Sequence, residues 1–320
     1  MIPYYTEADA RKVLDEKNSL QLARETFELI ARKKVFMPPK MYLVLTAAND
    51  FRAMPAFLET GPKPGEGACG IKWISVFPQN AAKGQPTVNG TILLSSTDTG
   101  TLLAILEANV ITAMRTAATA VLAASCMARP KPKVLALVGA GIQAAYQLRA
   151  HAGFFQFDEI RVWGFLPQEA ENFCRQETAF KNLKPCADIR SCVENADIVV
   201  TCTSSRKPLV QPEWIAPGTH INAIGADAKG KEELDPRILL KARVVVDEWE
   251  QASHSGEINV PISEGSFTRQ NVYAELSEVV SGQKQGRLSP DEITVFDSTG
   301  LAALDIHFSR HVYDRLQASR

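Results

Sequence analysis

An apolar run followed by a pair of glycines constrains the fold of this chain more than any other feature of its sequence. Residues 134–138 read Val-Leu-Ala-Leu-Val, and Gly139 and Gly141 follow before helix-forming residues begin at Ile142. This order predicts a buried strand, a tight turn and the start of a helix. Gly139 would permit the turn and Gly141 the close approach of a bound group, with Ala144 in the third position of the Gly-x-Gly-x-x-Gly/Ala pattern. The free N–H groups of the helix start would then favour an anion, most simply a pyrophosphate.

The segment after this turn alternates between strands and helices. Helices are predicted at 142–152, 168–179 and 235–241. Strands are predicted at 134–138, 160–164, 197–202, 219–224, 243–247 and 292–296. This alternation implies an α/β fold, with a Rossmann-type, doubly wound parallel sheet.

The segment before the turn has a different pattern. Residues 6–33 predict helix with Thr6 as its N-cap, and residues 103–127 predict one or two alanine-rich helices. Strands separated by proline-, glycine- and asparagine-containing loops are predicted at 41–46, 52–58, 70–77 and 87–96. We expect a β-rich α+β domain with an antiparallel sheet, completed by a C-terminal helix over 300–316. The predicted domains are 1–118 with 298–320, and 119–297.

Length and composition limit the class of protein. A chain of 320 residues favours two domains, and 35 lysines and arginines against 36 aspartates and glutamates do not suggest a nucleic-acid partner. The N-terminus lacks the pattern of a signal peptide, and the longest apolar run, around 117–127, is shorter than the ~20 residues of a membrane span. Six scattered cysteines favour reduced thiols, and no metal site is predicted. We expect a cytoplasmic protein with no membrane partner.

Three segments follow predicted strands of the second domain, where ligands of doubly wound folds bind. Residues 201–206 offer hydroxyls that would line an adenosine, or that simply cap the loop. Residues 222–227 carry small side chains that let a flat ring lie close, and Asp227 then projects into the crevice. Residues 296–300 end the last strand and open a helix, which predicts a second corner for an anion or amide.

Three basic residues of the first domain stand among apolar neighbours. Arg52 and Lys72 lie in consecutive predicted strands, and Arg115 lies in an alanine-rich helix. A cation in such surroundings is usually paired or functional, although a side chain that reaches out to solvent is the alternative. Arginine forks suit carboxylates and phosphates, so the substrate side of a site is expected here.

The end of the second predicted strand bears on the choice of cofactor. Residues 161–166 read Arg-Val-Trp-Gly-Phe-Leu. They include no acid that would bond a ribose 2′-hydroxyl and no arginine placed for a 2′-phosphate. The choice between NAD and NADP therefore stays open.

A series of motifs runs in order along almost the whole chain. They are Met37-Pro38-Pro39-Lys40, Arg52-Ala53-Met54-Pro55, Gly70-Ile71-Lys72-Trp73, Pro86-Thr87-Val88, Leu106-Glu107-Ala108, Arg115-Thr116-Ala117-Ala118, Gly139-Ala140-Gly141-Ile142-Gln143-Ala144, Thr219-His220-Ile221-Asn222-Ala223-Ile224-Gly225-Ala226-Asp227 and Asp297-Ser298-Thr299-Gly300-Leu301-Ala302. In these motifs the chain resembles the ornithine cyclodeaminase/mu-crystallin family. Residues 205–208, 230–235 and 256–260 are similar to its archaeal-type alanine dehydrogenase branch.

The resemblance implies a homodimer formed by the first domain, and a Rossmann domain that binds NAD or NADP. It implies hydride transfer between that cofactor and the Cα of a small amino acid or cyclic imino acid. Asp227 is similar to the family's catalytic acid/base, Arg52 and Lys72 to groups that contact the substrate, and Lys72 is also expected to act in catalysis. The residues implied to bind the cofactor are Thr87, Arg115, Thr116, Gly139, Ala140, Gly141, Ile142, Gln143, Trp163, Gly164, Thr203, Ser204, Ala223, Ile224, Gly225, Asp227, Ser298, Thr299 and Gly300.

The resemblance leaves three functions to separate. We expect an NAD(P)-dependent oxidoreductase that acts on a CH–NH or C=N bond, as an alanine dehydrogenase or ketimine reductase does. An ornithine or lysine cyclodeaminase would instead recycle NAD internally and release ammonia with no net change in the cofactor. A crystallin-like protein would bind NADP without turnover, but Arg52, Lys72 and Asp227 favour an enzyme.

Overall fold

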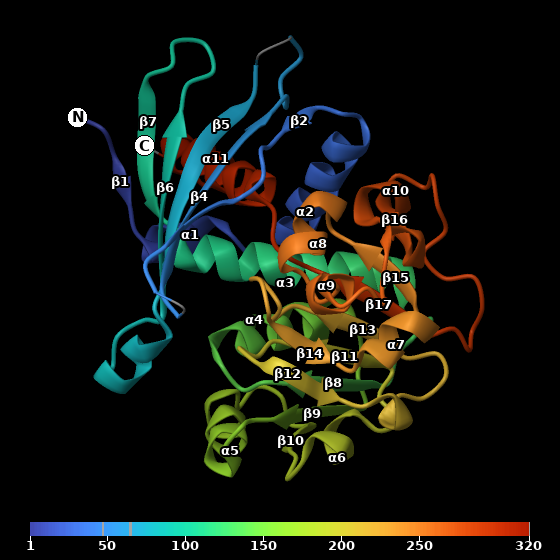
Figure 1. The fold of residues 1–320 in the computed structure, drawn as a ribbon. Helices are drawn as coiled ribbons and strands as arrows, with labels where there is room; N and C mark the ends of the chain where they lie inside the picture. Colours follow the sequence, from blue (N-terminus) through green and yellow to red (C-terminus); the bar gives the residue numbers. More distant parts are fainter. Residues whose placement is uncertain (47, 64–65, 320) are drawn as a thin grey trace. The chain divides into compact units, whose positions relative to one another are not determined.

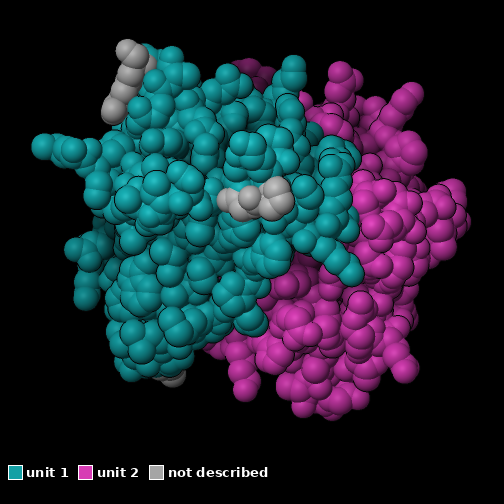
Figure 2. Space-filling view, turned by 90° about the horizontal axis from the view of Figure 1, so that it is seen from above, with its two compact units in different colours: residues 1–115, 301–320 teal, residues 116–300 magenta. Residues whose placement is uncertain are grey.

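The chain divides into two units, which Figure 2 shows in different colours. Each unit has its own large sheet. Unit 1 comprises Met1–Arg115 and Leu301–Arg320, and unit 2 comprises Thr116–Gly300. The computed structural model describes residues 1–46, 48–63 and 66–319. The division at 115 and 301 differs from the predicted boundaries at 118 and 298. Arg320, the last residue of the predicted first domain, lies outside the described residues.

Two helices begin unit 1 where one helical segment was predicted. They are α1 (Glu7–Val13) and α2 (Glu16–Ala31). The Thr6 side chain caps α1 by accepting a hydrogen bond from the backbone N–H of Asp9, as the sequence predicts. Asp15 caps α2 in the same way, and an N-cap residue has extended backbone, so α1 cannot continue into α2.

The sheet of unit 1 is mainly antiparallel, as predicted. Its central strands run in the order β7 (Leu102–Glu107), β6 (Val88–Ser95), β5 (Ala68–Val76), β4 (Asp50–Leu58); β3 (Met41–Val44) and β2 (Val35–Phe36) also pair with β4, and β1 (Tyr4–Tyr5) pairs with β7. A short 3-10 helix, η1 (Pro78–Lys83), connects β5 to β6. The prediction of helix from residue 103 is wrong, because 102–107 pair with β6. A short apolar run does not distinguish strand from helix until its partner is known.

Helix α11 (Ala302–Ala318) covers one face of this sheet, where it contacts β4, β5 and β6 (Figure 1). Gly70 of β5 permits this close packing. A Cβ at that position would lie 3.0 Å from Ile306 Cδ1 and would overlap the carbonyl oxygen of Leu93. The C-terminal helix therefore completes the β-rich unit, as the sequence predicts.

Unit 2 is built on a parallel sheet with the strand order β10-β9-β8-β11-β13-β17-β15-β16. Its strands are β8 (Val134–Val138), β9 (Glu159–Trp163), β10 (Leu183–Pro185), β11 (Ile198–Thr201), β13 (His220–Ala223), β15 (Arg243–Val246), β16 (Val272–Glu275) and β17 (Thr294–Asp297). From β8 the chain adds β9 and β10 on one side, and then returns to add β11 and β13 on the other. This is the predicted doubly wound α/β fold.

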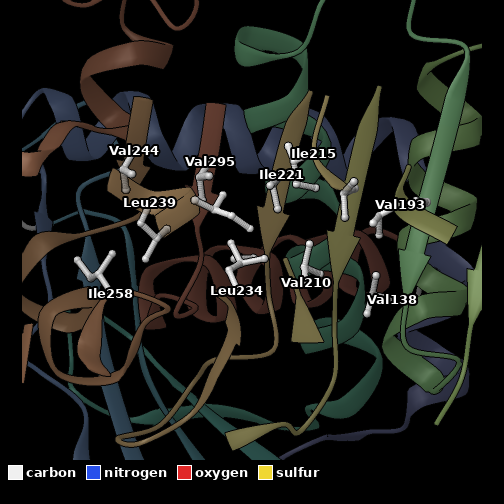
Figure 3. Packing of buried hydrophobic residues seen from close by; sticks show 14 of the residues in the cluster. Val138, Val193, Val210, Ile215, Ile221, Leu234, Leu239, Val244, Ile258 and Val295 are labelled. Atoms are coloured by element: carbon white, nitrogen blue, oxygen red, sulfur yellow. The ribbon is translucent and has the colours of Figure 1, made fainter. Parts of the chain in front are cut away.

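Apolar side chains cover both faces of the parallel sheet. Along β8, Ala136 and Val138 belong to one buried cluster (Figure 3), while Leu135 and Leu137 belong to another. Burial on both faces explains why this strand reads as a continuous apolar run.

Short elements complete unit 2. Its helices after the first glycine turn are α4 (Ile142–Phe154), α5 (Pro167–Gln176), α6 (Ile189–Val193), α7 (Pro236–Lys241), α8 (Trp249–Ser255), α9 (Asn259–Ser263) and α10 (Leu276–Val280), with 3-10 turns η2 (Pro212–Trp214) and η3 (Arg269–Asn271). Strands β12 (Arg206–Val210) and β14 (Glu232–Leu234) form a separate small sheet. The sequence predicted α4, α5 and α7. It missed the short helices α6, α8, α9 and α10 and the short strands β10, β12, β14 and β16, because a short segment carries little periodicity.

Helix α3 (Asn109–Met127) is long and apolar enough to satisfy the length and hydropathy criteria of a membrane span, with a mean hydropathy of 1.5. The sequence analysis underestimated this run. In the structure 78% of the apolar window is buried within the protein. Its apolar side chains are thus used in packing, as in the core helix of a folded domain.

Candidate functional site

The turn between β8 and α4 has the geometry that the glycine pattern predicts. Gly139 has φ of 120°, and a Cβ there would lie 2.9 Å from the carbonyl oxygen of Cys202. Gly141 is the N-cap of α4, and a Cβ at that position would meet no atom within 4 Å. Because the first N–H groups of a helix have no partner inside it, this open space lies beside donors suited to an anion.

This turn lies at the point where the sheet changes direction. Gly139 follows β8 and Cys202 follows the neighbouring β11, and the backbone N–H of Cys202 donates to the carbonyl of Val138. Ligands of doubly wound folds bind at such a switch point, outside the carboxyl ends of the strands. The other candidates of unit 2 lie at the ends of parallel strands of the same sheet. Trp163 ends β9 and Gly164 follows it, Thr203 and Ser204 follow β11, Ala223 ends β13 and residues 224–227 follow it, and residues 298–300 follow β17.

Gly164 is buried against the start of α5. A Cβ there would lie 2.8 Å from the Cβ of Glu169, whose carboxylate accepts a hydrogen bond from the backbone of Leu166. Gly164 therefore allows β9 to turn tightly into α5. Nearby, Arg161 is held by the carbonyl of Glu194 at 2.7 Å and by the carboxylate of Glu159.

A buried carboxylate that the sequence analysis missed joins two of these loops. The Glu233 carboxylate accepts hydrogen bonds from Thr201 Oγ1 at 2.6 Å, from the backbone N–H of Thr203 at 2.6 Å and from that of Gly225 at 2.8 Å. Burial raises the pKa of Glu233, while these donors favour its charged form. The loops after β11 and β13 are thus held at a fixed separation by one side chain.

Two more buried aspartates serve the loops that follow β15 and β17. Asp247 accepts hydrogen bonds from the backbone N–H groups of Thr299 and Gly300, at 2.7 and 2.8 Å, and from the Thr299 hydroxyl. Asp297 accepts from the backbone N–H groups of Glu257 and Ile258, at 2.9 and 3.2 Å. Asp247 directly follows the apolar strand β15, and Asp297 is the last residue of β17. An acid at the end of an apolar strand was therefore the sequence signal by which both could have been found.

Glu257 is a fourth buried acid, and its surroundings favour the neutral form. Its Oε1 accepts hydrogen bonds from the backbone N–H groups of Glu233 and Leu234, whereas its Oε2 is buried and has no hydrogen-bond partner among the described residues. Burial, and then the negative charge of Glu233, raise the pKa of Glu257 well above its usual value. A protonated carboxyl group satisfies this environment better than a carboxylate does.

The predicted acid/base residue, Asp227, lies in the loop after β13. Its Oδ1 lies 2.6 Å from the Nζ of Lys231, which also donates to the carbonyl of Gly225. The Asp227 side chain is 36% exposed and that of Lys231 is 16% exposed. Lys231 was not among the predicted site residues, although a cation four residues after an acid was visible in the sequence.

The basic residues of unit 1 meet an acid that the sequence analysis also missed. Asp305 of α11 lies 2.5 Å from the Nζ of Lys72 and 3.1 Å from the Nε of Arg115. The exposed fractions of these three side chains are 0%, 1% and 7%. The alternative that Lys72 or Arg115 reaches out to solvent is therefore wrong.

Burial and charge act against each other on Lys72. Burial lowers its pKa, Asp305 raises it, and Arg115 and Lys40 lower it, so the pKa of Lys72 falls to about 7. For Asp305, burial raises the pKa, but the charges of Arg115 and Lys72 outweigh burial and the pKa lies below its usual value. Lys72 can thus exchange a proton near neutral pH.

Arg52 lies on the same face of the sheet as Lys72. Met54 is the direct cross-strand partner of Lys72, and Arg52, two residues away on β4, points to the same side. Its Nε donates to Asp50 at 2.7 Å, and its guanidinium lies 5.2 Å from the ring centroid of Tyr42. The side chain is 5% exposed, so the guanidinium is oriented by neighbours before any ligand arrives.

The remaining candidates are distributed over both units. Thr87 is half-buried before β6, and its carbonyl accepts from the backbone of Phe77. Thr116 is buried in α3 directly after Arg115. Arg115, which the resemblance implies to bind the cofactor, pairs with Asp305 in unit 1, as Lys72 does. Among the described residues no group of three or more histidine, cysteine, aspartate or glutamate side chains is arranged to hold a metal ion.

Comparisons with known proteins agree with this arrangement. Residues 6–320 match the model of the ornithine cyclodeaminase/mu-crystallin family. Alanine dehydrogenase of Archaeoglobus fulgidus is 40% identical over 312 residues, which cover 97% of this chain and 93% of that protein.

Two solved structures are similar along their whole length. An archaeal alanine dehydrogenase dimer with bound NAD superposes with a TM-score of 0.93 at 39% identity, covering 99% of this chain and 97% of that one. Delta(1)-pyrroline-2-carboxylate reductase of Thermococcus litoralis, in complex with NADH and L-proline, superposes with a TM-score of 0.94 at 32% identity, covering 99% and 98%.

The raised pKa of Glu257 predicts a pH-dependent cost of folding. In the folded protein the Glu257 carboxyl group stays protonated at pH values above 4.5, where an unfolded chain has lost this proton. The stability that depends on the protonated form is therefore complete below pH 4.5 and is lost as the pH rises toward the pKa of the folded state. Glu257→Gln keeps a neutral side chain at every pH. The free energy of unfolding of the variant relative to the wild type should therefore increase from pH 5 to pH 9, measured by urea unfolding. Glu250→Gln, an exposed change on α8, is the control, and a pH-independent difference for Glu257→Gln would contradict the assignment.

Proposed function

Because the chain belongs to the ornithine cyclodeaminase/mu-crystallin family, we propose that it is an NAD(P)-dependent oxidoreductase of small amino and cyclic imino acids. The observation that carries this proposal is the pairing, in one chain, of two features. Unit 2 has a glycine turn at the switch point of a parallel sheet, and unit 1 has buried cations on one face of an antiparallel sheet. The first suits a dinucleotide and the second suits a carboxylate.

The residues of unit 2 fit a nicotinamide dinucleotide. The open space at Gly141 beside the start of α4 accommodates a pyrophosphate, with Gly139, Ala140, Ile142 and Gln143 as its neighbours along the turn. We propose that the ribose lies near Trp163 and Gly164 and the adenosine near Thr203 and Ser204. The nicotinamide would then contact residues 223–225 and 298–300, with Thr87 and Thr116 as further contacts.

The bound nicotinamide supplies or accepts a hydride, and the chain must manage protons and charge around the reacting C–N bond. We propose that Asp227 exchanges a proton with the substrate nitrogen, since its carboxylate is half-exposed in the loop after β13. The ammonium of Lys231 lies 2.6 Å from that carboxylate and orients it.

We propose that Arg52, Lys72 and Arg115 bind the substrate carboxylate. All three are buried cations of unit 1, and Lys72 and Arg115 share one acid, Asp305. A guanidinium can hold a carboxylate by two parallel hydrogen bonds, and so fixes the orientation of the carbon next to it. The resemblance implies a cofactor contact for Arg115, and we propose the substrate carboxylate for it because it shares Asp305 with Lys72.

The substrate that we propose first is pyruvate with ammonia, reduced to alanine, because the Archaeoglobus fulgidus relative is named alanine dehydrogenase. The cyclic imine pyrroline-2-carboxylate is the second candidate, because the Thermococcus litoralis structure is named as its reductase. Pyruvate and ammonia first condense to an imine with loss of water. In this imine, as in the cyclic imine, the carbon of the C=N bond carries a carboxylate, so the same cations serve either one.

The experiment is a panel of substrates with the purified full chain. Pyruvate with ammonia, pyrroline-2-carboxylate, ornithine and lysine are each supplied with NADH or NADPH, or with the oxidised cofactors, and absorbance of the reduced nicotinamide is followed. We expect net cofactor oxidation with pyruvate and ammonia or with the cyclic imine. Ammonia release from ornithine or lysine without net cofactor change would instead identify a lyase, and cofactor binding without any turnover would identify a binding protein.

The role of Asp227 predicts a selective loss of turnover. Asp227→Asn cannot accept a proton, so kcat should fall on the order of 10²-fold or more while the Kd of the cofactor changes little. Steady-state kinetics and fluorescence titration with the reduced cofactor measure the two quantities. Asp314→Asn, on an exposed side chain, is the control, and near-normal turnover of Asp227→Asn would exclude the role.

The open space at Gly141 predicts that a single methyl group weakens cofactor binding. In Gly141→Ala the added Cβ meets no protein atom, so the fold tolerates it at a cost of about 1 kcal/mol or less for the changed N-cap. The same methyl group would occupy space that we assign to the pyrophosphate, and we expect a rise in cofactor Kd of about tenfold. The Kd is measured by fluorescence titration, and an unchanged value would contradict the proposal that the pyrophosphate binds at this turn.

We further propose that the protein is a homodimer formed through the sheet face that α11 does not cover. Cross-strand register puts Met41, Leu43, Trp73 and Leu93 on the side opposite Lys72, and we call these four the outer-face patch. Their exposed fractions are 64%, 54%, 41% and 36%. Clustered exposed apolar side chains mark an interaction surface, and the archaeal alanine dehydrogenase structure is described as a dimer.

A charge placed in the outer-face patch should separate the subunits. Leu43→Glu or Trp73→Glu would bury a carboxylate without a partner, and we expect the mass in light scattering to fall from that of a dimer to about 35.0 kDa. Leu288→Glu, an exposed leucine of unit 2, is the control. A wild-type mass of one chain, or dimers unaffected by both changes, would contradict the proposal.

A further inference from the structure

The cluster of Lys72, Arg115 and Asp305 contains an acid whose position is set by three separate elements. Lys72 belongs to β5, Arg115 to α3 and Asp305 to the first turn of α11. Residues 115 and 305 are 190 positions apart in sequence. Because α11 packs on β5, with Ile306 next to Gly70, the preceding Asp305 comes to lie beside Lys72.

The Asp305 carboxylate is suited to hold both cations at once. Its Oδ1 accepts from the Nε of Arg115 and its Oδ2 faces the Nζ of Lys72, so each oxygen serves one cation. The first turn of a helix favours a negative charge through its dipole, and the charged form of Asp305 is therefore supported from its own helix as well. The backbone is held by the Ser309 hydroxyl, which donates to the Asp305 carbonyl at 2.7 Å.

We propose, resting on the function proposed above, that Asp305 is a positioning residue for substrate binding. Its carboxylate holds the Lys72 amino group beside the Arg115 guanidinium, so that the two basic groups meet the substrate carboxylate in a preformed arrangement.

Proton binding at Lys72 follows from the same arrangement. The groups that face Lys72 are Asp305 from α11, Arg115 from α3 and Lys40 ahead of β3. On the same sheet face, β4 contributes Arg52, which is paired with Asp50, and the β6 partner of Lys72 is the apolar Ile92. In this set Asp305 is the charge that raises the pKa of Lys72, which lies at about 7.

Removal of that charge should leave Lys72 neutral in the working range of pH. In Asp305→Asn, burial and the charge of Arg115 still disfavour the protonated form of Lys72. The negative charge of Asp305, which favoured that form, is gone. At pH 8 we expect the KM for the keto or imino acid to rise about tenfold or more, with a much smaller rise at pH 6. The alkaline limb of the kcat/KM profile should move to lower pH, and the cofactor Kd should stay within about twofold.

Matched variants separate positioning from a general loss of structure. Asp305→Glu keeps the charge and should restore part of the affinity at pH 8. Asp314→Asn makes the same chemical change on the exposed side of α11, where Asp314 pairs with Arg310, and should leave the profile unchanged. Lys72→Met should raise KM at every pH, and adding Asp305→Asn to it should cost little more, because the two residues act as one unit.

Binding of the carboxylate can also be measured without turnover. Calorimetric titration of pyruvate into the cofactor-loaded wild type, in buffers of different ionisation enthalpy, should reveal uptake of about one proton at pH 8 and far less at pH 6. Asp305→Asn should show much weaker pyruvate binding at pH 8. This arm separates the two proposals, since an inactive protein that binds pyruvate in this way keeps the role of Asp305 and loses the enzymatic function.

Two results would overturn the role of Asp305. One is a folded Asp305→Asn variant, judged by its thermal unfolding, with the wild-type KM at pH 8 and an unshifted profile. The other is a double variant, Asp305→Asn with Lys72→Met, whose KM rises by the product of the two single-variant factors. That result would mean that the two residues act independently.

Discussion

Buried carboxylates that must be satisfied by donors organise both units of this protein. An isolated ionised carboxylate inside a protein costs several kcal/mol, and the cost is offset only by hydrogen bonds or by an opposite charge. In unit 2 the donors are backbone N–H groups of the loops that Glu233 and Asp247 join. In unit 1 they are the cations that Asp305 holds. The loops and cations proposed for cofactor and substrate are therefore fixed by the same requirement.

This arrangement explains how short loops keep one conformation without secondary structure of their own. Loops at the ends of parallel strands must remain free on the side that faces a ligand, so packing can hold them only from behind. Glu233 does this for Thr203 and Gly225 with hydrogen bonds of 2.6 and 2.8 Å. At Gly225 a side chain would collide with that carboxylate and with the carbonyl of Thr203, so the glycine is required by the acid behind it. A preorganised loop loses less entropy when a ligand binds.

The parts that local sequence determines were predictable, and the parts that depend on distant contacts were not. The β8–α4 turn follows from an apolar run and the glycines after it. Residues 103–107 were included in a predicted alanine-rich helix, and pairing with β6 makes them part of a strand. The sequence analysis did not single out Asp305. Its partners lie on β5 and α3, and no spacing in the sequence connects them.

The same reasoning bears on how one fold serves relatives that act on different substrates. The imine of pyruvate and a cyclic imino acid share a carboxylate on the carbon that takes the hydride, and differ in what else that carbon and nitrogen carry. A cluster built from β4, β5, α3 and α11 is costly to change, because each cation in it is buried and replacing one leaves an uncompensated charge. The carboxylate-binding residues are therefore expected to remain while the surface that contacts the rest of the substrate varies. Substrate preference in this chain should accordingly be sought in side chains that contact the substrate without belonging to the buried cluster.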